Sequence, residues 1–139
     1  MIPRDLPAVL AIESQLAQPW EEADYRRHTI GRVAVIGEQI VGACVYALRP
    51  KKLLLVRLIV HQTVYRQGVG SAMIADLVAK LRHNRRTCIV VDAPDDSLAL
   101  HLFLKANGFA AVNVLRGDTY RFVRWVVSSW PAPPATLRE

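Results

Sequence analysis

Two glycines, Gly68 and Gly70, lie two residues apart where an apolar run gives way to a helix-forming run. The segment Tyr65-Arg66-Gln67-Gly68-Val69-Gly70-Ser71 follows the apolar residues 53–60 and precedes the apolar residues 72–81. The first N–H groups of a helix have no intrahelical acceptor and bind anions readily. Glycine also lets the backbone approach an anion closely. The segment therefore predicts a binding site for a phosphate or pyrophosphate group.

The elements that position this turn can be predicted from the apolar periodicity. Asp5 and Pro7 predict the start of a helix with an apolar stripe of Val9, Leu10, Ile12 and Leu16. The glycine turn opens a helix over residues 68–81, which we expect to be largely buried because apolar residues recur along it. Gly108 is suited to end a later helix. The remaining predicted elements are a short helix over residues 19–25, strands over 32–36, 40–48, 53–60, 88–91, 112–115 and 120–127, and a helix from Ser97 through Ala106.

Length and composition favour a single globular domain over residues 1–127, with residues 128–139 as a frayed tail. The net charge of +6 suits an acidic ligand. It would also suit nucleic acid, but no segment combines aromatic and basic residues as nucleic-acid binding requires. Apolar runs are shorter than the roughly 18 residues of a membrane span, and the first residues lack the apolar core of a secretion signal. We therefore expect a cytoplasmic protein that does not bind a membrane.

The two cysteines, Cys44 and Cys88, stand inside apolar runs. This placement predicts buried free thiols in a reducing compartment. Cysteine and histidine residues also lack the spacing of metal ligands, so no metal is expected.

The predicted order α-α-β-β-β-α-β-α-β-β, together with the glycine turn, resembles the GNAT superfamily of acetyl-CoA-dependent N-acetyltransferases. The family pattern Arg/Gln-x-x-Gly-x-Gly/Ala matches residues 65–70, with Tyr65 in the first position. Residues 5–13, 19–25, 59–61 and 107–109 resemble segments of the ribosomal-protein N-terminal (RimI-like) acetyltransferases. The resemblance implies an α/β GNAT fold with a mixed six- to seven-stranded sheet flanked by helices.

The resemblance also implies a site for acetyl-CoA. Backbone groups of Leu58, Ile59 and Val60 would pair with the pantetheine arm, as an added strand pairs with the edge of a sheet. Ser97 stands where the family has asparagine at the start of the fourth helix. The pyrophosphate would be held by backbone N–H groups of the glycine turn, namely Arg66, Gln67, Gly68, Val69, Gly70 and Ser71, with the Ser71 hydroxyl as a further donor.

Acetyl transfer needs a base for the amine and a proton for the leaving thiolate. The position of the family's carboxylate base holds Asp92, which ends an apolar strand, and desolvation there would suit a base. The alternative is that Asp92 pairs with a nearby arginine. The position of the family's tyrosine acid holds Leu104, so Tyr120, Tyr65 or water would have to donate the proton.

The expected reaction is direct acetyl transfer from acetyl-CoA to the α-amine of a protein or peptide, with ribosomal proteins among the acceptors. Three acidic residues on the first two helices, Glu13, Glu22 and Asp24, could attract a cationic acceptor. A small-molecule amine is the alternative acceptor, favoured by the short loop over residues 116–119. A degenerate module that binds acetyl-CoA without catalysis is favoured by Leu104 and Tyr65. The sequence leaves the oligomeric state open.

Overall fold

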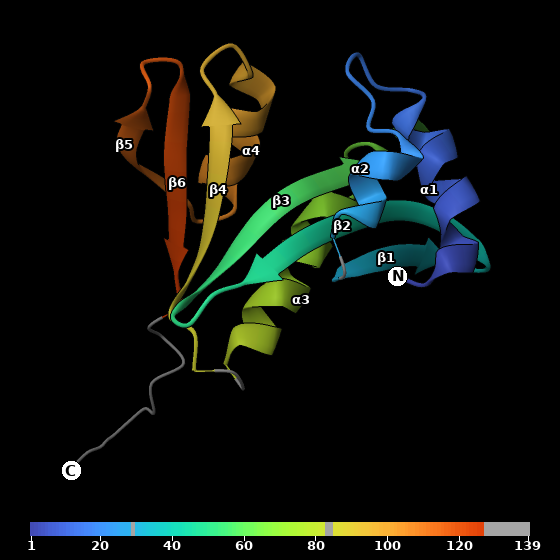
Figure 1. The fold of residues 1–139 in the computed structure, drawn as a ribbon, viewed down its shortest axis with the longest axis horizontal. Helices are drawn as coiled ribbons and strands as arrows, with labels where there is room; N and C mark the ends of the chain where they lie inside the picture. Colours follow the sequence, from blue (N-terminus) through green and yellow to red (C-terminus); the bar gives the residue numbers. More distant parts are fainter. Residues whose placement is uncertain (29, 83–84, 127–139) are drawn as a thin grey trace. The chain divides into compact units, whose positions relative to one another are not determined.

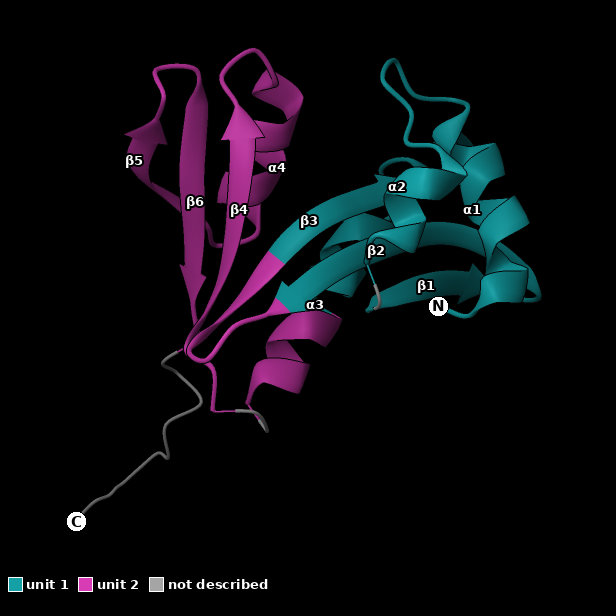
Figure 2. Ribbon diagram, in the orientation of Figure 1, with its two compact units in different colours: residues 1–47, 55–75 teal, residues 48–54, 76–139 magenta. Residues whose placement is uncertain are grey.

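The computed structural model describes residues 1–28, 30–82 and 85–126. They fall into two compact units, unit 1 of residues 1–47 and 55–75 and unit 2 of residues 48–54 together with the described residues from 76 onward (Figure 2). The predicted order of helices and strands is confirmed, with two short 3-10 turns added (Figure 1). The predictions for residue 127 and for a tail over residues 128–139 lie outside the described residues. The described helices are all too short or too polar to cross a membrane.

The described strands form a six-stranded mixed sheet in the order β1-β2-β3-β4-β6-β5, which agrees with the predicted fold class. The helices are α1 (Leu6–Glu13), α2 (Glu22–Arg26), α3 (Val69–Leu81) and α4 (Leu98–Ala106). The strands are β1 (Gly31–Ile36), β2 (Gln39–Leu48), β3 (Lys52–Val60), β4 (Cys88–Pro94), β5 (Ala110–Leu115) and β6 (Thr119–Trp125).

Unit 1 is a three-stranded sheet, β1-β2-β3, with β1 and β2 antiparallel and helices on both faces (Figure 1). Alternate residues of a strand point to opposite faces. One face carries Ala43, Val45 and Ile59, which pack in one core with Val9 and Ile12 of α1 and with the Tyr25 ring of α2. The first turns of α3 pack on the other face, where Gly42 faces Val69 and Met73. Both faces of β2 are therefore covered, which its nearly continuous apolar sequence allows.

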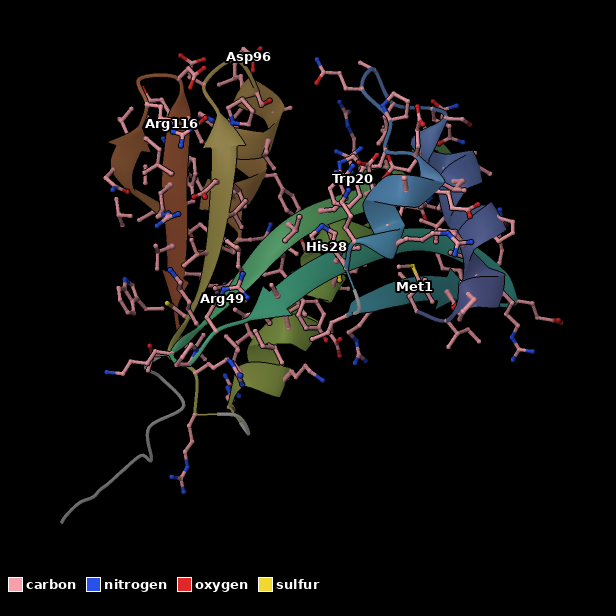
Figure 3. All side chains as sticks on the ribbon, viewed as in Figure 1. Met1, Trp20, His28, Arg49, Asp96 and Arg116 are labelled. Atoms are coloured by element: carbon pink, nitrogen blue, oxygen red, sulfur yellow. The ribbon has the colours of Figure 1, made fainter. Side chains whose placement is uncertain are left out.

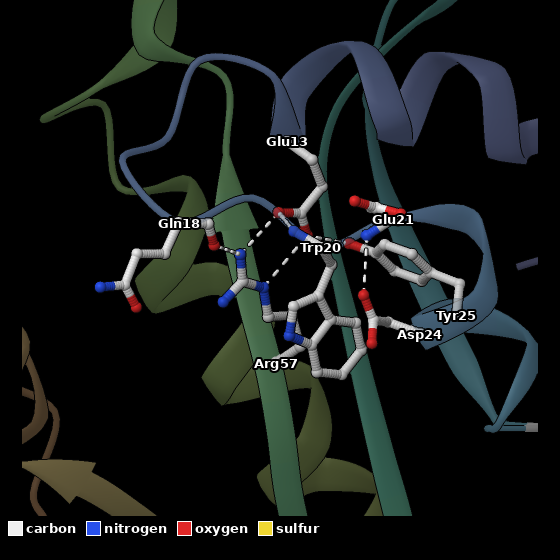
Figure 4. A network of polar contacts seen from close by, with 7 residues as sticks. All are labelled: Glu13, Gln18, Trp20, Glu21, Asp24, Tyr25 and Arg57. Carbon is white, nitrogen blue, oxygen red and sulfur yellow. Dashed lines mark hydrogen bonds and ion pairs between the residues drawn. The ribbon is translucent and has the colours of Figure 1, made fainter.

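A carboxylate stands among the apolar residues of this core. The side chain of Glu13 is only 1% exposed, because Glu13 falls on the same helical face as Val9 and Ile12. It accepts hydrogen bonds from the Tyr25 hydroxyl, from the Trp20 N–H (2.8 Å) and from Arg57 Nε and Nη2 (3.0 and 2.5 Å) (Figure 4). Arg57 lies on β3, so the buried ion pair joins α1 to the sheet.

Unit 2 contains the antiparallel ladders β4–β6 and β5–β6. The first residues of β3 also belong here, where Lys52–Leu54 pair in parallel with Cys88–Val90. One face of the ladder holds Cys88, Val90 and Val123, and α4 packs on the other, where His101 contacts Phe122. Both cysteines are buried and lie outside any disulfide among the described residues, as predicted. Burial raises the pKa of Cys88, which disfavours its reactive thiolate.

Two expectations about the helices are wrong. The recurrence on α3 predicts a largely buried helix, but only one stripe, including Met73, Leu77 and Leu81, is buried. The other side of α3 consists of small or polar residues such as Ala75, and it is exposed. The second helix starts at Glu22 rather than at residue 19, since residues 14–21 form the connection between α1 and α2. Leu16 therefore packs against the core from this connection and not from a helix.

Gly108 should tolerate substitution less than Gly117. Both have positive φ angles, 85° and 80°, which cost about 1 kcal/mol for a residue with a Cβ. A Cβ at Gly108 would also lie 2.7 Å from Arg124 Nη1 and would displace this group from its hydrogen bond to Asn107 O, whereas none of the described atoms lies within 4 Å of a Cβ at Gly117. We expect Gly108→Ala to lower the free energy of unfolding measured in urea by about 2 to 3 kcal/mol, and Gly117→Ala by about 1 kcal/mol. Equal losses would contradict the packing at Arg124.

The stability of the protein should fall in acid through Glu13. Burial raises the pKa of Glu13, but hydrogen bonds from Arg57, Tyr25 and Trp20 outweigh it and hold the pKa below its ordinary value of 4.5. A lowered pKa stabilises the fold above the unfolded-state value, and this contribution is lost as the pH falls through the folded-state value. The free energy of unfolding should therefore drop below about pH 4.5, and less steeply in Glu13→Gln. Parallel pH profiles for the two proteins would contradict this.

Candidate functional site

The glycine turn before α3 has the backbone geometry of an anion site. Arg66 and Gly68 both have left-handed backbones, with φ angles of 67° and 80°. Turns of this kind arrange backbone N–H groups around anions. The Ala72 N–H donates to Gly68 O (2.9 Å), so the N–H groups of Val69, Gly70 and Ser71 come before the first α-helical hydrogen bond. Among the described residues these N–H groups meet no acceptor, so they are available to a ligand, as the predicted pyrophosphate site requires.

One donor of the predicted set is already used within the protein. The Gln67 N–H donates to Val64 O at 3.2 Å, so it contributes less to an anion than its neighbours do. The Arg66 side chain is exposed and supplies a cation next to the turn. An anion at the N-terminus of α3 would therefore meet positive charge from both the helix and Arg66.

Gly42 allows α3 to lie close to the sheet, a role that was not predicted from the sequence. A Cβ at Gly42 would lie 3.1 Å from Ile59 O, 3.2 Å from the Met73 sulfur and 3.3 Å from Val69 Cγ1. A larger residue would push the first turn of α3 away from β2 and β3. A glycine in the interior of a strand is the signal that could have identified this close approach.

The segment Leu58–Val60 ends β3, which is an edge strand of unit 1. Ile59 is buried against α1, whereas Leu58 and Val60 are half-buried. The parallel register of β3 with β4 runs only over Lys52–Leu54. Within unit 1, the main-chain groups of Leu58–Val60 that face away from β2 therefore meet no strand, and an amide-bearing ligand could pair with them.

Asp92 lies on β4 and pairs with an arginine, which was the alternative left open by the sequence. Arg121 Nε donates to Asp92 Oδ1 (2.8 Å) and Arg121 Nη2 to Oδ2 (3.0 Å). These hydrogen bonds raise the pKa of the Arg121 guanidinium. The expectation of a desolvated carboxylate is wrong, because a third of the Asp92 side chain is exposed. The carboxylate is oriented by Arg121 and reachable by water.

Tyr120 lies on β6 opposite Ala93, one position along the ladder from the Asp92–Arg121 pair. Neighbouring pairs of an antiparallel ladder point to opposite faces. Tyr120 therefore faces α4, where its ring lies 5.4 Å from the His101 ring, and Asp92 faces the other way. The structure does not bring these two side chains together.

Ser97 precedes α4 as its N-cap residue. Its C=O accepts from the His101 N–H (3.0 Å), and its N–H donates to Pro94 O (3.3 Å). Within the described residues its side chain makes no capping hydrogen bond, so its hydroxyl is not committed to the helix.

Leu104, at the position of the family's tyrosine acid, is 1% exposed in the core. The loop between the last strands is as short as predicted, a turn over residues 116–118, and Asp118 O accepts from the Asp95 N–H at 2.8 Å. Figure 3 labels Arg116 and Asp96, which mark this turn and the β4–α4 loop beside it. Tyr65 is half exposed at the start of the glycine turn.

The acidic residues of the first two helices are already paired with arginines. Glu13 is buried with Arg57, Glu22 Oε2 accepts from Arg26 Nε at 2.7 Å, and Asp24 lies 3.5 Å from Arg27. The expectation that Glu13 could attract a cationic acceptor is therefore wrong, because its charge is neutralised inside the protein.

The two units divide the predicted site residues. Unit 1 contains Leu58–Val60 and the glycine turn over residues 65–71. Unit 2 contains Asp92, Ser97 and Tyr120. Each unit by itself therefore offers one part of the chemistry: main-chain donors for a phosphorylated, amide-bearing ligand in unit 1, and an oriented carboxylate in unit 2.

Comparison with solved structures finds the same fold in several acetyltransferases. The ribosomal-protein-S18-alanine N-acetyltransferase from Escherichia coli matches with a TM-score of 0.81 at 16% identity, covering 91% of this chain and 90% of that one. Ard1 from Thermoplasma volcanium matches with a TM-score of 0.79 at 20% identity, over 90% and 93%. An aminoglycoside 6'-N-acetyltransferase complexed with coenzyme A matches with a TM-score of 0.77 at 13% identity, over 96% and 95%.

No protein of curated function matches the sequence. The family model described as "Acetyltransferase (GNAT) family" matches residues 4–109, which is most of the chain and includes β3, the glycine turn and Asp92. GNAT acetyltransferases use acetyl-CoA as the acetyl donor. The chain belongs to the GNAT acetyltransferase family, and it is an acetyl-CoA-dependent enzyme that transfers an acyl group from CoA to an amine.

Proposed function

We propose that the acceptor is the N-terminal α-amine of a protein or peptide in the cytoplasm, with ribosomal proteins as the first candidates. The observation that favours this acceptor most is the likeness to the S18-alanine N-acetyltransferase over nine-tenths of both chains. The sequence supports it independently, since residues 5–13 and 19–25 resemble the paired N-terminal helices of RimI-like enzymes.

The chemistry of the amine also favours an α-amine. Its pKa is near 8, against about 10.4 for a lysine side chain. At pH 7 roughly a tenth of an α-amine is neutral, but only a few in ten thousand of the lysine amines. An enzyme whose base is a partly exposed aspartate has little means of deprotonating a strongly basic amine.

In the proposed reaction, the neutral amine attacks the thioester carbon of acetyl-CoA directly. Main-chain N–H groups of Leu58–Val60 polarise the carbonyl, and Asp92, oriented by Arg121, takes the proton of the amine through water. The acetyl group passes to nitrogen as the carbon–sulfur bond breaks, and the thiolate takes a proton from water. A cysteine intermediate is not proposed, because both thiols are buried.

A small-molecule amine is the second candidate acceptor. The turn over residues 116–118 favours it, because so short a connection between β5 and β6 overhangs little of an acceptor site. The likeness to an aminoglycoside 6'-N-acetyltransferase gives this candidate further support.

Acceptor preference can be measured as CoA release. We expect short peptides with a free N-terminus to have a kcat/KM at pH 7 at least about 100 times that of the same peptides with a blocked N-terminus and one lysine, from the neutral fractions of the two amines. Aminoglycosides, polyamines and free amino acids complete the panel. A faster reaction with any small amine than with every N-terminal peptide would reject the proposed acceptor in favour of the second candidate.

Substitution of Asp92 tests the base. We expect Asp92→Asn to lower kcat about 100-fold, the lower end of general-base effects, and to leave acetyl-CoA affinity within about twofold. Arg121→Gln is the control for loss of the ion pair alone, and it should lower kcat much less. Tyr120→Phe should change kcat by less than about threefold, because Tyr120 faces α4 rather than Asp92. A large loss of kcat in Tyr120→Phe with a normal kcat in Asp92→Asn would assign the catalytic role to Tyr120 and not to Asp92.

A further inference from the structure

The segment expected to pair with the pantetheine arm directly follows a residue of a buried ion pair. Leu58–Val60 is an edge of unit 1, and an edge strand has a strand neighbour on one side only. Arg57 immediately precedes this segment, and its guanidinium is fixed by Glu13 from α1. We infer that Glu13 and Arg57 are positioning residues, which fix the edge of β3 so that its main chain can pair with the pantetheine arm of acetyl-CoA.

The contact between the two residues has the geometry of a rigid link. Two guanidinium nitrogens of Arg57 reach both carboxylate oxygens of Glu13, and planar two-point pairs of this kind fix orientation as well as distance (Figure 4). The Arg57 side chain is 22% exposed and that of Glu13 1%, so water competes little. Burial lowers the pKa of Arg57, but the hydrogen bonds and the charge of Glu13 raise it by more. The guanidinium therefore stays charged.

The same guanidinium is fixed by the connection between α1 and α2. Arg57 Nη2 donates to Gln18 O at 3.3 Å, and the Arg57 guanidinium carbon lies 5.2 Å from the centre of the Trp20 ring. The Trp20 ring in turn lies 5.2 Å from Tyr25, edge to face, and 5.5 Å from His28, stacked. Trp20 and His28 are labelled in Figure 3. Arg57 is therefore held on several sides by residues of one unit.

The position of Arg57 connects this network to the ligand. Side chains alternate along a strand, so Arg57 and Ile59 point to the α1 face. The hydrogen bonds that the main chain offers a ligand lie in the plane of the sheet, at right angles to the direction in which these side chains point. The ion pair can thus fix the strand from one face without occupying the edge. This inference rests on the proposed contacts of Leu58–Val60 with the pantetheine arm.

The test compares two ligands by titration calorimetry on the full chain. Acetyl-CoA has the pantetheine arm, whereas adenosine 3'-phosphate 5'-diphosphate keeps the pyrophosphate and lacks the arm. We expect Glu13→Gln and Arg57→Lys to weaken acetyl-CoA about tenfold, as the loss of one or two main-chain hydrogen bonds would, and to change the affinity for the arm-free ligand by less than about twofold. Arg57→Lys keeps the positive charge. If Glu13→Gln does not fold, the test is made with Arg57→Lys alone.

Two control variants give the limits of the expected result: no change in either affinity, and equal weakening of both. Glu22→Gln removes an exposed carboxylate paired with Arg26 on the same unit, and it should change neither affinity. Gly68→Ala strains the left-handed turn, and it should weaken both ligands alike.

Equal weakening of both ligands by Glu13→Gln and Arg57→Lys, or no weakening of acetyl-CoA, would overturn the inference. Wild-type protein that binds both ligands equally would overturn it together with the proposed contacts of Leu58–Val60. The acceptor proposal stands or fails separately, because no amine is present in these titrations.

Discussion

Glu13 is a carboxylate shielded from water, and the arrangement of unit 1 follows from the groups that compensate it. Burying a charge without partners costs far more than a single domain can supply. Glu13 therefore requires Arg57 from β3, the Tyr25 hydroxyl from α2 and the Trp20 N–H from the connection before α2. Removal of one partner from such a buried pair costs about 3 to 5 kcal/mol, because the other charge remains buried. The pair thus specifies how two helices and a strand meet, whatever its net contribution to stability.

With β3 fixed from its face, the segment Leu58–Val60 is left without a strand neighbour on one side within unit 1, and the proposed pairing with acetyl-CoA depends on this edge. The carboxyl end of β3 leads, through the left-handed residues Arg66 and Gly68, directly into the N-terminus of α3. Gly42 allows the start of this helix to lie close to the main chain of β3. Unit 1 consequently presents two kinds of main-chain donor on consecutive segments: an open strand edge that suits amides and a helix N-terminus that suits phosphates. Acetyl-CoA carries both groups on one flexible arm.

The sequence predicted the order of the elements and most of their boundaries, because apolar periodicity and glycine positions are local properties. It missed the role of Glu13, although Glu13 stands four residues after Val9 and one after Ile12, within the apolar stripe of α1. That position was the available signal. Its partner Arg57 is 44 residues away and could not be identified without the packing of α1 on the sheet. The Asp92–Arg121 pair and the separation of Asp92 from Tyr120 depend on the β4–β6 register, which no local pattern contains.

In the proposed complex, acetyl-CoA pairs with the edge of β3 over Leu58–Val60 while its pyrophosphate binds the turn before α3. Amide hydrogen exchange with and without acetyl-CoA measures this directly. We expect slower exchange on binding at amides of Leu58–Val60 and at Val69, Gly70 and Ser71, with little change in β1 and β5. Protection confined to other segments, with unchanged exchange at both of these sites under saturating acetyl-CoA, would contradict it.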